Sequence, residues 1–160
     1  MIDQELASII RFILGAIPEA TAHYFDTPKD FSVPAVYFPA PTFESKGDTF
    51  LTYAFNYTWN IEIFHTSTED AIALARRAAD AIMANRRLIP LVDESGALTG
   101  KGLRLHDPRV GKSGMLVASL TLGWASRRPY NAEDVPKMMS YILNINDPEK
   151  RSAEAVEGQE

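Results

Sequence analysis

The chain has 160 residues, of which 46% are hydrophobic, and it carries a formal net charge of −5 at pH 7. Its length suits one domain whose core needs no cross-link. The absence of cysteine excludes disulfides, thiolate metal sites and cysteine nucleophiles, and the acidic balance argues against broad non-specific binding of nucleic acids. No apolar run approaches the roughly 20 residues of a membrane helix, so we expect no membrane contact.

The N-terminal segment, residues 3–17, predicts an amphipathic helix, because its apolar side chains recur at three- and four-residue spacing. Asp3 is the expected N-cap, and Pro18 ends the pattern. Residues 18–34 are rich in proline and turn residues and are expected to be irregular. Residues 33–38 then predict a short strand framed by prolines. We expect it to lie at a sheet edge or to end abruptly, because proline donates no hydrogen bond to a neighbouring strand.

Residues 50–64 predict the strand around which the sheet is organised. The odd-numbered residues from Leu51 to Ile63 are all apolar, and the even-numbered residues between them are polar or small. Because successive side chains of a strand point to opposite faces, this strand has one aromatic face and one polar face. A single apolar face favours an antiparallel sheet. The strand is longer than the usual length of about five or six residues, so we expect it to run past the body of the domain as an arm or as a wall shared with another subunit. A short strand near residues 41–44 and a turn at 45–48 are expected to join it as a protruding hairpin.

A second helix is expected over residues 66–87. Thr66 and Glu69 have the spacing of a capping box. Arg86 and Arg87 are expected in the last turn, where cations oppose the negative end of the helix dipole. The side facing the sheet is alanine-rich, which permits close approach, and its predicted buried residues are Ile72, Ala75, Ala79, Ile82 and Met83.

The rest of the chain predicts a hairpin or loop at 91–100, a strand at 102–106, a basic loop at 107–114 and a second long strand at 115–125. Taken together, the elements predict an α+β fold with a mostly antiparallel or mixed sheet and helices packed on one of its faces.

The C-terminal part predicts a short helix followed by a tail. Asn131 is the expected cap, and the apolar side is formed by Val135, Met138, Met139 and Ile142. The residues after Pro148 are polar and lack periodicity. We therefore expect one domain over residues 1–146 and a flexible or partner-ordered tail over residues 147–160.

The candidate chemistry of the chain is sparse. Gly111-Lys112-Ser113 suggests a phosphate loop, but His106 stands where that motif needs glycine, and a strand follows instead of a helix. His65 and His106 both follow predicted strands, and Glu69 or Asp107 could complete a metal or acid–base cluster with them. A small enzyme or ligand-binding domain using these histidines stays open as an alternative. The prediction that we adopt has no catalytic residue, no cofactor and no metal.

Basic side chains gather near both ends of the last long strand, and such a cluster is typical of a partner contact. The proline-framed strand and the hairpin turn offer a second surface. The candidate residues for a subunit or partner interface are Phe38, Pro39, Pro41, Lys46, Asp48, Arg109, Lys112, Arg127, Arg128 and Tyr130.

The order of these elements resembles that of the tail terminator, or tail completion, proteins of long-tailed bacteriophages. The resemblance rests on the opening helix 6–17, the strand 33–37, the long strand that feeds the helix 66–87, and the closing strand 115–124. It covers nearly the whole chain up to Tyr130 and is one of pattern, without a signature motif. The helix and tail after Tyr130 have no counterpart in this pattern.

The resemblance implies an α+β structural protein of the virion that is not an enzyme and that assembles in the host cytoplasm. It implies a ring, usually a hexamer, that caps the tail tube, stops its polymerisation and joins the tail to the neck proteins below the head. The implied partners are the tail tube protein and a neck or head-completion protein, and DNA passes through the lumen without specific binding. Another head–tail connector, neck or tail structural protein is the nearest alternative.

Overall fold

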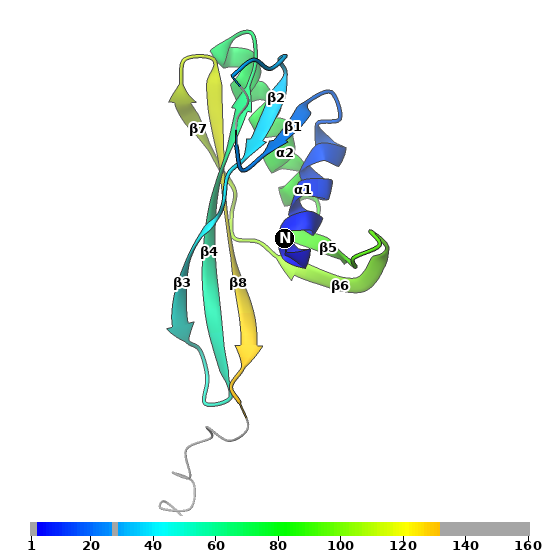
Figure 1. The fold of residues 1–160 in the computed structure, drawn as a ribbon, viewed down its shortest axis with the longest axis vertical. Helices are drawn as coiled ribbons and strands as arrows, with labels where there is room; N and C mark the ends of the chain where they lie inside the picture. The colour runs from blue at the N-terminus through cyan, green and yellow to red at the C-terminus, as the bar shows by residue number, and fades with distance from the viewer. Residues whose placement is uncertain (1–2, 27–28, 132–160) are drawn as a thin grey trace, which may run out of the picture.

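The computed structural model describes residues 3–26 and 29–131. The molecule is elongated. A long, twisted sheet runs along its vertical axis in Figure 1, with helices and a small hairpin beside the upper half and the middle, while the lower part of the sheet continues downward alone. The predicted helix at 131–142, the tail at 147–160 and the domain boundary between them lie outside the described residues.

The first element, α1 (Gln4–Ala16), confirms the predicted N-terminal helix. Its buried side chains Ile9, Ile10 and Ile13 follow the predicted spacing. The segment after it is not wholly irregular, because β1 (Thr21–Tyr24) pairs in parallel with β2 (Ala35–Phe38). The predicted edge position of the proline-framed strand is therefore wrong: β2 lies between β1 and β4 (Thr52–Phe64).

The long strand β4 confirms the predicted organising element and its antiparallel surroundings. It pairs antiparallel with β2, with β3 (Thr42–Gly47) and with β8 (Val117–Pro129). The predicted hairpin of β3 and β4 is present, but β3 runs on to Gly47, so the turn lies at residues 48–51 instead of 45–48. Asp48 and Thr49 donate their backbone N–H groups to the Thr52 carbonyl and close this turn.

The second helix, α2 (Thr68–Ala84), is shorter than predicted at both ends. Its N-cap is Ser67, not Thr66, and the Ser67 hydroxyl accepts the Asp70 N–H at 3.0 Å. Arg86 and Arg87 lie beyond the helix with positive φ angles of 55° and 62°, so the prediction that they end it is wrong. The buried residues are Ala71, Leu74, Ala75, Ala78, Ala79 and Ile82.

The buried side of α2 is alanine-rich, as predicted, but not every residue predicted to be buried there is buried. Met83 was expected to be buried and is about half exposed, and Ile72 is only partly buried. The small alanines allow α2 to approach β4, β7 and β8 closely, as predicted.

After α2 the chain forms a separate two-stranded sheet of β5 (Leu88–Val92) and β6 (Leu98–Arg104). The segment 91–100, predicted as a hairpin or loop, is the turn region of this hairpin, and the strand predicted at 102–106 overlaps the end of β6. The predicted basic loop is instead a strand, β7 (Arg109–Gly114), which pairs with the first part of β8. The predicted strand 115–125 is β8, shifted to 117–129. It pairs with β4 along the full length of both strands.

The main sheet has six strands in the order β1-β2-β4-β8-β7, and β3 pairs with the lower part of β4. The core lies between the helices and the upper half of this sheet. Trp59 and Trp124 are its largest side chains and are 2% and 0% exposed. The fold is thus α+β with a mixed, mostly antiparallel sheet and helices on one face, as predicted.

Candidate interaction site: the projecting arm

We use the term arm for three strand segments that extend below the helices: β3 (42–47), residues 52–58 of β4 and residues 122–129 of β8 (Figure 1). The register places β3 and β8 on either side of β4, with Phe43 opposite Tyr57 and Trp124 opposite Tyr57. Among the described residues no strand pairs with the outer edge of β3, or with the outer edge of β8 beyond Trp124. The arm therefore presents two unpaired strand edges.

The aromatic face of the arm is a continuous ladder of rings. Phe43 meets Phe55 at a centroid distance of 5.3 Å and Tyr57 at 5.4 Å, and Tyr53 meets Tyr130 at 5.3 Å. At its upper end Tyr57 stacks on Trp124 at 4.8 Å, where the ladder enters the core. Edge-to-face and offset stacking of this kind stabilises aromatic pairs beyond the area that they bury.

This ladder is only partly covered. Phe43 is 57% exposed and Leu51 is 63% exposed, and Tyr53 and Phe55 are of intermediate exposure. The guanidinium of Arg128 lies 5.0 Å from the centre of the Phe55 ring, a cation–π contact on the same face. An apolar surface of this continuity marks an interaction site in a folded protein.

The opposite face of the arm is polar. Its side chains include Thr42, Glu44, Lys46, Asn56 and Thr58, which alternate with the aromatic residues along β3 and β4. At the tip, the Arg127 side chain donates to the Asp48 carboxylate at 2.7 Å and ties the end of β8 to the hairpin turn. The Tyr130 N–H donates to the Leu51 carbonyl beside it. The two faces therefore differ sharply in polarity, as the alternation in β4 predicted.

The structure divides the predicted interface residues between four places. Lys46, Asp48, Arg127, Arg128 and Tyr130 lie in the lower part and at the tip of the arm.

The other predicted residues lie elsewhere. Arg109 and Lys112 are on β7, opposite Thr121 and Ala118 of β8, and Arg109 is thus roughly 20 Å from the tip along the strand. Pro39 and Pro41 join β2 to β3. Phe38 is 1% exposed and belongs to the core of the subunit, so its side chain stays inside unless the subunit rearranges.

The structure does not bring His65 and His106 together. The His65 N–H donates to the Leu116 carbonyl, and the His106 N–H donates to the Gly123 carbonyl, seven positions further along the same segment. That spacing separates the two backbones by roughly 20 Å. In the part of the chain that is described, no group of three or more His, Asp and Glu side chains is placed to hold a metal ion.

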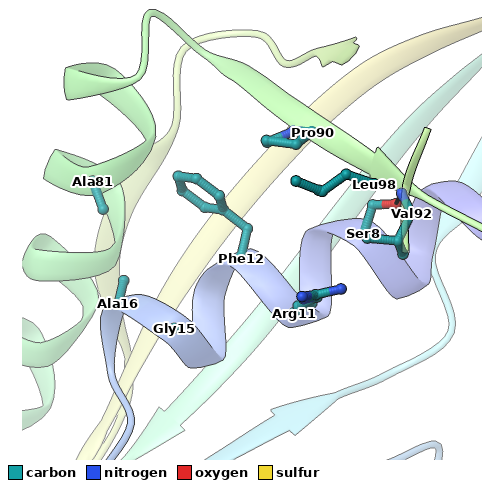
Figure 2. Close-up of a pocket in the computed structure, with 9 residues that line it drawn as sticks. All are labelled: Ser8, Arg11, Phe12, Gly15, Ala16, Ala81, Pro90, Val92 and Leu98. Carbon is teal, nitrogen blue, oxygen red and sulfur yellow. Dashed lines mark hydrogen bonds between the residues drawn. The ribbon is translucent and has the colours of Figure 1, made fainter. Parts of the chain in front are cut away.

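One hollow of about 420 Å³ lies between α1, the end of α2 and the β5–β6 hairpin. Figure 2 shows Phe12 reaching from α1 toward Pro90, with Val92 and Leu98 on the hairpin side. Arg11 at its rim donates to the Gly96 carbonyl. Another, of about 190 Å³, lies on the polar face, where His106 sits over Gly123.

Within residues 3–26 and 29–131, three side chains have displaced pKa values. Burial raises the pKa of the Tyr57 hydroxyl in the aromatic ladder, with Arg128 opposing the shift. A hydrogen bond from Arg77 lowers the pKa of Glu19 where the loop after α1 meets α2. Hydrogen bonds from Ser95 and from turn N–H groups lower the pKa of Asp93. All three shifts have structural causes, and none lies in a cluster of catalytic type.

The sequence interpretation missed part of the site. It named the tip residues but did not name Phe43, Tyr53 and Phe55 as an exposed surface, because a strand with one apolar face is ordinarily covered by a core. The length of the strand at 50–64 predicted that it runs past the body of the domain, and β4 and β8 are indeed 13 residues long. The rings exposed on that projecting part were not named.

The chain is 34% identical over 134 residues to the uncharacterized protein YqbJ of Bacillus subtilis (strain 168), a match that covers 82% of this chain and 90% of that protein. It is 32% identical over 146 residues to the phage-like element PBSX protein XkdJ of the same organism, which covers 89% of this chain and 97% of that protein. No family model matches. No helix within the described ranges has the length and apolar character needed to cross a membrane.

Proposed function

The chain belongs to the family of the phage-like element PBSX protein XkdJ and YqbJ, and from this premise we propose that it is a structural protein of a phage or phage-like particle that forms a tail terminator ring. The ring caps the tail tube, stops its polymerisation and joins the tail to the neck. The observation that carries the proposal is the arm with its two unpaired strand edges. The resemblance of the element order to tail terminator proteins supports the same role.

Ring closure requires a heterologous interface, in which two different patches of one subunit meet. The arm offers such patches on its opposite sides, since β3 is one edge and β8 is the other. Unpaired strand edges are templates for pairing with another chain, and natural monomers cover, shorten or twist them away. Pairing of the β3 edge of one subunit with the β8 edge of the next repeats around a closed ring.

The difference in polarity between the two faces of the arm determines which face lines the lumen of such a ring. The polar face, with Glu44, Asn56 and Thr58, suits a water-filled lumen. The aromatic face turns away from it, because exposure of these rings to water is unfavourable. A lumen of mixed and mostly neutral side chains holds DNA weakly, which agrees with passage of DNA and with the net charge of −5. The proposed role uses no catalytic residue, cofactor or metal.

The test combines the mass in solution with binding to tail tubes. Light scattering and negative-stain images are expected to show a ring, or a monomer that becomes a ring at the ends of purified tubes. A hexamer is the expected ring. A compact monomer or dimer that ignores tube ends contradicts the proposal, and a ring that ignores tubes but binds a head-completion protein favours another neck protein.

A pair of adjacent substitutions tests the edge directly. Glu44→Pro and Ser45→Pro lie at successive positions of β3, where backbone N–H groups alternate between β4 and the outside. One of the two prolines removes an N–H group that points away from β4. This variant is expected to keep the circular dichroism spectrum of the folded chain and to lose the ability to form the ring. The other proline removes a bond to β4 and destabilises the hairpin. Rings that survive the outward proline refute pairing through β3.

A further inference from the structure

The aromatic face of the arm lacks a cover in the part of the chain that is described. α1 reaches down to Trp124, whose indole N–H donates to the Glu5 carboxylate at 2.7 Å. Below that contact the sheet continues without a helix beside it (Figure 1). The rings of Phe43, Tyr53 and Phe55 form an apolar strip there. An exposed strip of this kind fits a contact with another chain.

The β5–β6 hairpin projects from the subunit at the level where this strip begins. Leu105, directly after β6, forms a bridge to Trp124 at the outer edge of β8. Trp124 lies opposite Tyr57 of β4, and Tyr57 lies opposite Phe43 of β3. The base of the hairpin and Phe43 therefore lie in one row across the sheet, at its two opposite edges. Figure 1 shows the hairpin on the side where the lower part of β8 lies, away from β3.

The hairpin lies in the same layer as α1. The Ser8 hydroxyl accepts the Val92 N–H at 3.0 Å, and Arg11 donates to the Gly96 carbonyl in the hairpin turn. α1 covers the face of the sheet that holds Trp124, and this face continues downward as the aromatic face of the arm. The hairpin thus projects past the β8 edge on the aromatic side of the sheet.

The proposed ring places the arm of the next subunit beside this hairpin. The β3 edge of that subunit pairs with β8 beyond Trp124, directly below the base of the hairpin. Strands about 4.8 Å apart put the outermost strand of the neighbouring arm roughly 15 Å from β8. β6 has seven residues and is roughly 23 Å long, so the hairpin is long enough to cross all three strands. Two sheets packed in this way lie about 10 Å apart.

The exposed side chains of the two surfaces match in kind. On the hairpin, Leu98 is 69% exposed and Leu88 is also exposed; on the arm, Phe43 is exposed. Glu94 stands in the hairpin turn, farthest from β8 of its own subunit, and Arg128 stands on the outermost strand of the next arm. Neither charge forms an ion pair within the described structure. The contact therefore pairs apolar with apolar and acidic with basic side chains.

We propose that the β5–β6 hairpin of each subunit packs across the aromatic face of the arm of the next subunit in the ring. The hairpin cannot cover Phe43 of its own arm, because it leaves the sheet at the opposite edge. This contact rests on the proposed ring and names the segment that covers its aromatic surface. Its two patches differ, as a ring interface requires.

Cross-linking of assembled full-length chains tests the contact. The chain has no native cysteine, so pairs can be introduced without background. Ser45 lies on the aromatic face opposite Phe55, and Lys46 lies on the polar face opposite Ala54. Ser45→Cys is combined in turn with cysteine in place of three exposed hairpin residues, and Lys46→Cys with the same three partners is the matched control. The three hairpin changes are Leu88→Cys, Leu98→Cys and Lys101→Cys.

The cross-linker is a bismaleimide whose reach matches the spacing of about 10 Å between packed layers. At least one Ser45→Cys pair is expected to give covalent dimers and higher oligomers on a denaturing gel, and the Lys46→Cys pairs are expected to stay monomeric. Rings in which both series cross-link equally, or neither does, overturn the hairpin contact and leave the ring standing. Links confined to single chains overturn it as well. Absence of a ring in light scattering overturns the ring and this contact together.

A charge exchange gives a second readout. Arg128→Glu is expected to raise severalfold the concentration at which half of the chains are in rings, because it places like charges together. Adding Glu94→Arg is expected to restore assembly. Adding Asp80→Arg instead, on the exposed side of α2, is the control and is expected to restore nothing. Equal rescue by the two second changes, or rescue by neither, contradicts the placement of Glu94 beside Arg128.

Discussion

Replacing Trp59 with alanine tests the interpretation of the core most directly. The Trp59 side chain is 2% exposed, its ring meets Phe38 at 5.6 Å and Trp124 at 6.1 Å, and its indole N–H donates to the Pro39 carbonyl at 2.6 Å. A buried Trp→Ala change costs about 3–5 kcal/mol. Loss of the hydrogen bond adds about 1 kcal/mol. We therefore expect Trp59→Ala to lose at least about 4 kcal/mol of unfolding free energy.

The assay is urea denaturation followed by far-ultraviolet circular dichroism, at several protein concentrations so that any assembly is separated from folding. Trp59→Phe keeps a ring in the same space and is expected to lose about 1–2 kcal/mol, mainly through the hydrogen bond and the smaller ring. Met115→Ala is the control, since Met115 is 85% exposed, and it is expected to change stability by less than about 0.5 kcal/mol. A loss below about 1 kcal/mol for Trp59→Ala refutes the placement of Trp59 in the core.

Three further predictions concern single contacts. Ser67→Ala is expected to lose about 1 kcal/mol, because Ser67 caps α2, whereas Thr66→Ala is expected to lose less than half of that; equal losses would contradict the assigned cap. Ser8→Ala is expected to lose about 1–3 kcal/mol in urea denaturation, because the buried Ser8 hydroxyl accepts the Val92 N–H at 3.0 Å. Arg77 lowers the pKa of Glu19 in the folded chain. The contact between the two side chains therefore stabilises the folded state above the ordinary glutamate pKa of about 4.3, and this stabilisation is lost as the pH falls through the lower pKa of the folded state. The stability advantage over Glu19→Gln should therefore shrink on acidification; an advantage that grows would contradict this sign.

The elements with strong period signals could be predicted from the sequence. α1, α2, β4 and β8 each bury one face, and burial imposes the spacing that the sequence displays. Their ends were predicted less well. Ser67 and Thr66 are both good caps by residue type, and only the backbone direction at the end of β4 decides between them.

The elements that were missed are stabilised by neighbours and not by their own pattern. β1 has four residues and is a strand because it pairs with β2, which the chain reaches only ten residues later. β7 contains two glycines and charged side chains, and it becomes a strand because the upper half of β8 offers it an edge. Such pairing depends on tertiary structure that a local pattern does not contain.

In the candidate site, too, some features could be predicted from the sequence and others depend on tertiary structure. The protruding hairpin followed from the length of β4 and the turn residues before it, and the structure contains that hairpin. Phe38 was named as an interface residue because prolines flank it, yet it fills the core under Trp59. Proline limits backbone hydrogen bonds and does not determine where the neighbouring side chain points. The separation of His65 and His106 likewise depends on the register of β8, which neither histidine encodes.

The edges and the aromatic face of the arm are different surfaces, and this makes their roles separable. The ring requires the backbone edges of β3 and β8, whereas the aromatic face lies between these edges. A three-stranded arm with one bare apolar face is poorly suited to stand in water before assembly. The outward proline on β3 should abolish the ring and leave the binding of an apolar-surface dye to the aromatic face of the free subunit unchanged.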